Sequence, residues 1–238
     1  MSAGSNKISA LILDMDGVIV DTEPIHVDSF RVFLKKRAIV APEDFLLGLI
    51  GHSVEENVKE IRRTYFSGQY SDMGNDVRER EDIYLDLLKA SAIKPQPGLE
   101  KLVKYCLKAG IKLALASSSI REQISVILDK LHVQSGNTLN YHAVFSEIVS
   151  GEDVIRKKPA PDIYTLALSK MGVKHSQGLA VEDSPAGIQA AQAAGLKCIA
   201  IRTDYVAAER LAIADNIINT LDEVPEILQN YNMLNIGA

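Results

Sequence analysis

Two carboxylates stand close together near the start of the chain, where the apolar run Ala10–Leu13 is followed by Asp14, Asp16 and Gly17. A short apolar run of this kind predicts a buried strand that stops at a polar edge. Loops at the carboxyl edge of a parallel sheet often bind ligands, and two close carboxylates repel each other unless a cation or a shared proton intervenes. These residues alone are compatible with a metal site, an acid/base pair, or a polar turn that caps an edge strand.

Other polar side chains follow other predicted strands. Ser117 ends an apolar run, Glu182 and Asp183 end another, and Lys158 precedes a predicted helix. Because the carboxyl ends of parallel strands meet at one edge of a sheet, we expect these side chains to converge with the first two aspartates. Crowded carboxylates need a cation, and oxygen-only ligands favour Mg²⁺. A hydroxyl, an ammonium and helix N-termini supply donors for an anion, so the set suits a phosphoryl group.

The elements that must position these residues alternate between strand and helix patterns in the second part of the chain. We expect further strands at Lys112–Ala116, Ala143–Phe145, Gly178–Val181, Lys197–Ile201 and Asn216–Ile218. We expect helices at Gly98–Ala109, after Ser119, at Pro161–Met171 and from Pro185, with a capping box at Ser119-x-x-Glu122 and an N-cap at Ser184. This alternation predicts an α/β fold: a Rossmann-like parallel sheet with helices on both faces.

Helical patterns dominate between the first strand and this alternating part. They cover Ile25–Lys36, Val54–Tyr65 and Val77–Lys89, with turn-rich breaks at residues 51–53 and 67–75 and a return linker around residues 94–98. We therefore predict a catalytic core made of residues 1–21 and 96–238. A small all-helical cap domain of residues 22–95 is expected to be inserted after the first strand.

The composition excludes several classes of protein. The net charge of −5 over 238 residues provides no basic field for nucleic acid. No apolar run reaches the roughly 18 residues of a membrane span, and residues 1–7 lack the apolar centre of a signal peptide. The cysteines, Cys106 and Cys198, lie in apolar segments and indicate no disulfide framework, as expected of a cytoplasmic protein. We expect both chain ends, including Met233–Ala238, to be loose.

Four motifs in this order resemble those of the haloacid dehalogenase-like superfamily, in its phosphatase and phosphomutase branch. They are Asp14-Met15-Asp16-Gly17-Val18-Ile19, then Ser117, then Lys158 in K-P-A-P, then Glu182-Asp183-Ser184-x-x-Gly187. The match covers about residues 7–21 and 96–220. The segment Asp21–His26 also resembles the D-T-E-P-x-H sequence that is common in the beta-phosphoglucomutase-like subfamily, and the insert resembles that branch's helical cap.

The resemblance implies a covalent mechanism. Asp14 would be the nucleophile that forms an aspartyl phosphate, and Asp16 would protonate the leaving oxygen and then deprotonate water. The Asp14 side chain, the Asp16 backbone carbonyl and Asp183 would hold Mg²⁺. Glu182 is either a metal ligand, directly or through water, or a hydrogen-bond acceptor behind the ligands.

The resemblance also implies which groups would bind the substrate. Ser117 and Lys158, with backbone N–H groups after the nucleophile, would hold the phosphoryl oxygens. In the cap, the substrate would be selected by residues that include Thr22, His26, Gly51 and Ser53. For two of these the structural alternatives stay open, because Thr22 could only cap a helix and His26 could lie on the surface.

The sequence favours a phosphatase that acts on a small phosphorylated metabolite, a sugar phosphate, with Mg²⁺ as cofactor. A carboxylate at Asp16 argues against dehalogenation, because a halide leaving group needs no proton. The alternative is a phosphohexomutase, whose cap arginine is replaced by Val54; Arg62, Arg63 and Arg80 are possible substitutes. A catalytically silent, phosphate-sensing protein is the alternative from another class. The sequence does not distinguish a monomer from a dimer.

Overall fold

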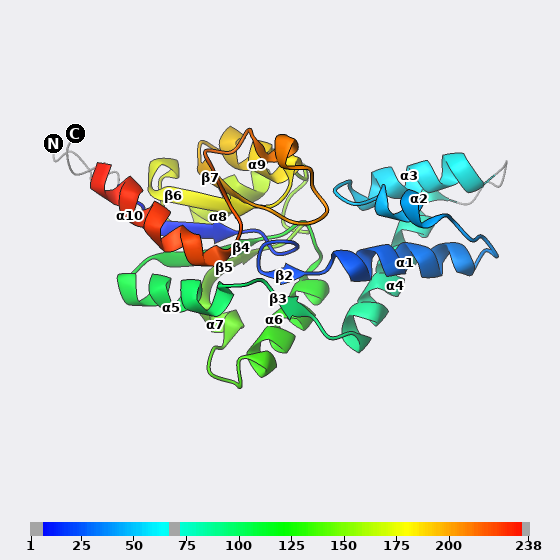
Figure 1. Ribbon diagram of the computed structural model, residues 1–238, viewed down its shortest axis with the longest axis horizontal. Coiled ribbons are helices and arrows are strands. Elements are labelled where there is room, and N and C mark those ends of the chain that lie inside the picture. Colours follow the sequence, from blue (N-terminus) through cyan, green and yellow to red (C-terminus); the bar gives the residue numbers. More distant parts are fainter. Residues whose placement is uncertain (1–6, 67–71, 235–238) are drawn as a thin grey trace. The chain divides into compact units, whose positions relative to one another are not determined.

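The structure is a computed structural model that describes residues 7–66 and 72–234 (Figure 1). The chain divides into two compact units, one of Thr22–Ala92 and one of the chain before and after it. The second unit therefore resumes at Ile93, before the expected residue 96. Ile93 is buried, and its carbonyl accepts a hydrogen bond of 2.7 Å from Gln134 Nε2, which ties the returning chain to the core at this point. The strands β2 (Val20–Asp21) and β3 (Lys94–Pro95) then pair antiparallel.

Six strands of the larger unit form one sheet in the order β5-β4-β1-β6-β7-β8, and all neighbouring strands run parallel. The strands are β1 (Ala10–Leu13), β4 (Lys112–Ala116), β5 (Phe145–Val149), β6 (Gly178–Glu182), β7 (Lys197–Ile201) and β8 (Asn216–Ile218). The predicted parallel α/β fold is confirmed. Strand β1 lies at the centre because its short apolar run is fully buried on both faces.

Helices cover both faces of this sheet (Figure 1). The helices are α5 (Leu99–Ala109), α6 (Arg121–Gln134), α7 (Tyr141–Val144), α8 (Asp162–Met171), α9 (Pro185–Ala193) and α10 (Val224–Leu234), with single turns η1 (His175–Gln177), η2 (Ala208–Leu211) and η3 (Leu221–Glu223). Small strand residues such as Ala10, Ala114 and Ala180 pack against α8 and α9. Leu11 and Leu13 alternate onto the opposite, equally buried face, where α5 and α10 lie.

Two expectations for this unit are wrong, and a third, for the chain ends, falls partly outside the described residues. The segment Ala143–Phe145 is mainly the end of α7, because Asn140 caps that helix by accepting from the His142 N–H at 3.1 Å. Helix α6 begins after Ile120 instead of Ser119, and Gln123 Oε1 accepts from the Ile120 N–H at 3.3 Å. Met233 belongs to α10, and the remaining expectation for the chain ends concerns residues 1–6 and 235–238, which lie outside the described part.

The regular elements among the described residues of the unit Thr22–Ala92 are all helices, joined by turns and loops. It contains α1 (Glu23–Lys35), α2 (Glu43–Leu47), α3 (Val54–Tyr65) and α4 (Met73–Ala90) around a common apolar core. Helix α2 was not predicted, and α4 begins before the expected Val77 because the Asp72 side chain caps it by accepting from the Gly74 N–H. Residues 67–71 of the predicted break lie outside the described part. No helix among the described residues is long and apolar enough to cross a membrane.

Candidate active site

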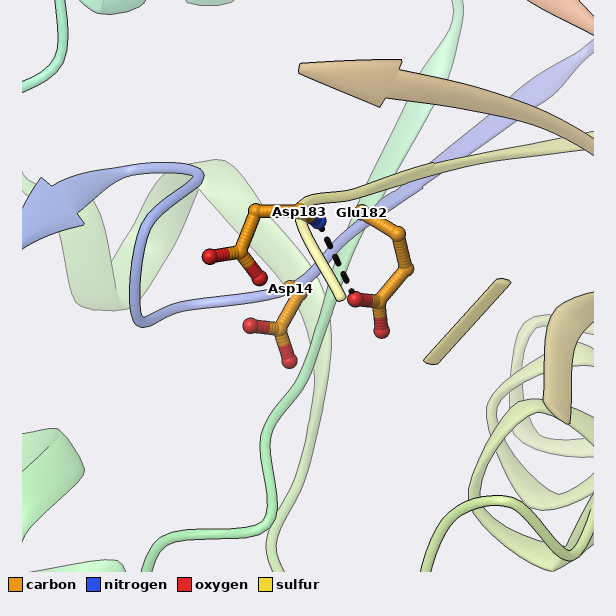
Figure 2. A group of neighbouring side chains, drawn as sticks. All are labelled: Asp14, Glu182 and Asp183. Atoms are coloured by element: carbon orange, nitrogen blue, oxygen red, sulfur yellow. Dashed lines mark hydrogen bonds between the residues drawn. The ribbon is translucent and has the colours of Figure 1, made fainter. Parts of the chain in front are cut away.

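The central strand positions an aspartate at the carboxyl edge of the sheet. Asp14 follows β1 directly, and its N–H donates to the Val181 carbonyl of the neighbouring β6 at 3.0 Å. The side chains of Glu182 and Asp183, at the end of β6, therefore lie beside it, with carboxylate oxygens of all three residues within 4.8 Å of one another (Figure 2). Because all three side chains are buried, this close group of negative charge needs a positive partner.

Lys158 is that partner within the chain. Its Nζ donates to Asp14 Oδ1 at 2.5 Å, to Glu182 Oε1 at 2.6 Å and to the Ala116 carbonyl at 3.1 Å. An ammonium has three N–H donors, so these acceptors use all of them. Lys158 therefore orients the Asp14 carboxylate in this structure, and binding a phosphoryl oxygen as well requires it to exchange one of these bonds. The Ala116 bond is the longest of the three and joins an uncharged acceptor.

Glu182 accepts hydrogen bonds at both of its carboxylate oxygens. Lys158 and the Tyr164 hydroxyl donate to Oε1, the latter at 2.5 Å, while the Asp183 N–H and the Ser184 hydroxyl contact Oε2 at 3.2 Å. The absence of a side chain on Gly187 makes room for this carboxylate, because a Cβ there would overlap it. These contacts fit the interpretation of Glu182 as a hydrogen-bond acceptor that supports the metal ligands. The contacts at Oε2 are longer than those at Oε1.

Asp16 lies in the tight loop that leads from β1 to β2. The Gly17 N–H donates to the Val20 carbonyl at 2.7 Å, and Gln96 Nε2 donates to the Gly17 carbonyl at 2.9 Å, so the loop is anchored on both sides. The Ser119 hydroxyl donates to Asp16 Oδ2 at 3.1 Å. Ser119 thus contacts the site and does not cap α6, which is a role that the sequence analysis missed.

Ser117 follows β4 and is fully buried. Its N–H pairs with the Val149 carbonyl at 3.0 Å, and its Oγ accepts from the Ser119 N–H at 3.0 Å, so its hydroxyl proton is available for another acceptor. Gly151 packs closely against this loop, because a Cβ at that position would overlap the backbone of Ser118. The Gly151 N–H also donates to the Ser119 carbonyl at 3.0 Å, which attaches the loop to the chain after β5.

The electrostatics of the group fit a divalent cation. Burial raises the pKa of Asp14 to about 8; the Lys158 ammonium opposes this shift, and the Glu182 and Asp16 carboxylates add to it. One ammonium thus does not compensate the buried carboxylates, whereas a hard dication bound to their oxygens would stabilise the ionised forms. Carboxylate oxygens are also the donors that Mg²⁺ prefers, so the residues present fit this ion.

The remaining predicted site residues lie in the helical unit Thr22–Ala92. Thr22 is buried at the N-cap position of α1. Gly51 has a positive φ of 81° in a turn, and Ser53 caps α3 through a reciprocal pair of hydrogen bonds with Glu56. Local structure accounts for the residue types of Gly51 and Ser53, whereas the Thr22 side chain makes no cap hydrogen bond to α1.

His26 is part of a buried cluster in the same unit. Its Nδ1 accepts from Arg80 Nη2 at 2.6 Å, and its ring stacks on Tyr84 with centroids 4.0 Å apart. The Arg80 guanidinium also lies 4.3 Å from the centre of the Phe30 ring. An arginine donates only, so the His26 ring nitrogen accepts in this contact. The surface position that the sequence left open for His26 is therefore not observed.

Comparison with known proteins gives consistent matches. A family model described as haloacid dehalogenase-like hydrolase matches residues 11–201. A CBBY-like protein of Arabidopsis thaliana is 33% identical over 92% of this chain and 70% of its own. A phosphorylated carbohydrates phosphatase of Thermotoga maritima is 26% identical over 91% of this chain and 100% of its own.

A solved structure extends these matches to three dimensions. A CbbY variant from Rhodobacter sphaeroides, in complex with xylulose 1,5-bisphosphate, superposes with a TM-score of 0.75. It is 26% identical to this chain and covers 91% of it and 96% of its own length. The similarity therefore extends over both units and is not limited to the four short motifs.

Proposed function

Because the chain belongs to the haloacid dehalogenase-like hydrolase family, we propose that it is a Mg²⁺-dependent phosphatase of a small phosphorylated sugar. The observation that carries the proposal is the buried Asp14 carboxylate, which Lys158 orients at 2.5 Å and which shares its edge of the sheet with Glu182 and Asp183. A carboxylate held in one orientation is prepared to act as a nucleophile.

In the proposed reaction the phosphoryl group passes through Asp14. A carboxylate oxygen of Asp14 attacks phosphorus, the bond from phosphorus to the sugar oxygen breaks, and Asp16 gives its proton to that oxygen. Asp16 then takes a proton from water, the water oxygen attacks phosphorus, and the bond to Asp14 breaks. Acid and base help of this kind contributes roughly 10²–10⁴-fold in rate. Ser117 would orient the phosphoryl oxygens through its hydroxyl proton.

Mg²⁺ would be held by oxygens of four residues: the side chains of Asp14 and Asp183, the backbone carbonyl of Asp16, and Glu182 Oε2. When bound, the ion would neutralise negative charge between the nucleophile and the phosphate. Its binding would also keep Asp14 ionised against the effect of burial. Lys158 would complement the ion, because its ammonium donates to Asp14 Oδ1 and neutralises part of the carboxylate's charge.

Two similar proteins support a sugar phosphate as the substrate class. One relative is a phosphatase of phosphorylated carbohydrates, and the similar CbbY variant was solved with a sugar bisphosphate. The three arginines that could substitute for the missing mutase arginine have other partners: Arg62 pairs with the buried Asp76, Arg63 with Glu60 at the surface, and Arg80 with His26. Hydrolysis is therefore the function we propose.

The test is phosphate release from p-nitrophenyl phosphate and from a panel of sugar phosphates, with Mg²⁺ and with a chelator. We expect turnover only with Mg²⁺, and its loss in Asp14→Asn, which keeps the shape of the side chain. Absence of turnover with every substrate in the presence of Mg²⁺ would contradict the proposal. To test the mutase alternative, beta-glucose 1-phosphate is supplied with a trace of glucose 1,6-bisphosphate; formation of glucose 6-phosphate without phosphate release would favour the mutase.

A further inference from the structure

Tyr164 is a buried residue next to the proposed site that neither the motifs nor the proposed reaction uses. It lies on α8, its side chain is fully buried, and its hydroxyl donates to Glu182 Oε1 at 2.5 Å. The Lys158 Nζ lies 5.2 Å from the centre of its ring. In the sequence it is one apolar-face residue of a helix, so no local pattern distinguishes it from an ordinary core aromatic.

The direction of this hydrogen bond is settled by chemistry. Glu182 Oε1 already accepts from the Lys158 ammonium at 2.6 Å, and an ionised carboxylate can only accept. The Tyr164 hydroxyl is therefore the donor in this hydrogen bond. The ring belongs to the buried apolar cluster that includes Ala10 of β1 and Ile188 of α9.

Lys158 and Tyr164 both donate to Glu182 Oε1, so the Tyr164 bond affects how strongly Lys158 is attracted to Glu182 relative to Asp14. Lys158 divides its N–H groups among Glu182, Asp14 and a backbone carbonyl. The Tyr164 hydroxyl satisfies part of the negative charge on Oε1, so Glu182 attracts the ammonium less strongly. Without that donor, the same oxygen depends on Lys158 alone, and the ammonium is drawn toward Glu182 and away from the nucleophile.

We propose that Tyr164 is a positioning residue that, by donating to Glu182, keeps the Lys158 ammonium against Asp14. The inference rests on the proposed function in so far as Asp14 is the nucleophile there. Tyr164 itself touches neither Asp14 nor, in the proposed reaction, the substrate. It acts through the chain Tyr164–Glu182–Lys158–Asp14, whose three links are 2.5, 2.6 and 2.5 Å long.

The first test is Tyr164→Phe, with Tyr141→Phe as the matched control. Phenylalanine keeps the ring, and Glu182 keeps three other donors, so the variant retains its core. Losing one hydrogen bond to a charged group corresponds to a decrease in kcat of about tenfold. KM for p-nitrophenyl phosphate and the midpoint of thermal unfolding should stay close to those of the wild type. Tyr141 is a similarly buried tyrosine on α7, and its variant should keep the full kcat.

A double-mutant cycle tests whether Tyr164 acts through Glu182. In a Glu182→Gln background the acceptor carries no charge, so adding Tyr164→Phe should lower kcat by less than twofold. An unchanged kcat in the single variant contradicts the proposal. So does an equal decrease in the Tyr141→Phe control, or a full tenfold decrease in both backgrounds, because the effect would then not pass through Glu182.

A direct measurement of Lys158 does not depend on catalysis. The ¹⁵Nζ signal of Lys158, assigned by its loss in Lys158→Arg, should show slow proton exchange in the wild type. Exchange should become several-fold faster in Tyr164→Phe and stay unchanged in Tyr141→Phe. If the wild type hydrolyses nothing, the proposed function fails, whereas this measurement still decides the role of Tyr164: unchanged exchange in Tyr164→Phe contradicts it.

Discussion

The carboxylate of Asp183 occupies the space that a side chain on Gly17 would need. A Cβ built on Gly17 would overlap Asp183 Oδ2, and the backbone of Gly17 has a φ of +78°, which L side chains rarely adopt. Glycine is thus required at this position for two independent reasons, the shape of the loop and the proximity of an acidic side chain from another strand. The second reason links the first motif physically to the fourth.

This relationship predicts that Gly17→Ala will displace Asp183. We expect apparent Mg²⁺ affinity, measured by calorimetric titration, to fall by about tenfold, since one carboxylate ligand of the proposed site is lost or misplaced. Gly110→Ala is the matched control: its φ of +67° is similar, but a Cβ there would meet no atom within 4 Å. Both variants should lose about 1 kcal/mol of stability from backbone strain. Equal Mg²⁺ affinity in the two variants would rule out the displacement.

Asp16→Asn should distinguish substrates by their leaving groups. A sugar alkoxide is a poor leaving group and needs a proton, whereas p-nitrophenolate leaves without one. We expect kcat to fall by about 10²–10⁴-fold with the sugar phosphate, and less with p-nitrophenyl phosphate, for which only the hydrolytic half-reaction needs Asp16. Steady-state kinetics with both substrates measure the difference. The same loss with both would mean that Asp16 does not protonate the leaving group.

Asp76→Asn should destabilise the helical unit. Asp76 is 2% exposed and pairs with both Arg37 and Arg62, which are 26% and 21% exposed. Removing its charge weakens both contacts, but Arg37 keeps its bond to Glu79 at 2.6 Å and both arginines reach water, so we expect a loss of about 2 kcal/mol. Urea unfolding measures this loss. Glu60→Gln, in the exposed pair with Arg63, is the control and should unfold like the wild type.

Asp153 should contribute to stability in a pH-dependent way. Burial opposes ionisation of this carboxyl, but hydrogen bonds from the Ser150 N–H and hydroxyl, at 2.8 and 2.9 Å, and the charge of Arg121 lower its pKa below 3.8. A lowered folded-state pKa stabilises the protein above the unfolded-state pKa, and that contribution is lost as pH falls through the folded-state pKa. The difference in unfolding free energy between wild type and Asp153→Asn, about 1 kcal/mol at pH 7, should shrink below about pH 4. A difference that stays constant down to pH 2.5 would contradict this.

Much of the fold could be predicted because its signals are local. The strands Lys112–Ala116, Lys197–Ile201 and Asn216–Ile218 have the predicted bounds, since short apolar runs rich in Ile, Leu and Ala between turn residues favour buried strands. The Ser184 cap is confirmed by its 3.0 Å bond from the Gly187 N–H. The capping box at Ser119 failed because its hydroxyl found a partner, Asp16, that is far away in the sequence, and Ile120, which has no side-chain cap bond, takes the N-cap position.

The sequence by itself determined that this is a parallel α/β core with acidic strand ends and a helical insert, because periodicity and turn chemistry are properties of neighbouring residues. It also predicted that Asp14, Ser117, Lys158, Glu182 and Asp183 meet at one edge, and strands β4, β1 and β6, which precede three of these positions, are neighbours in the sheet. Only the tertiary structure decided how they share their hydrogen bonds: Lys158 between Asp14 and Glu182, and Tyr164 behind them. These partners lie up to 144 residues apart in the chain, and packing, which no local pattern encodes, brings them within hydrogen-bond distance.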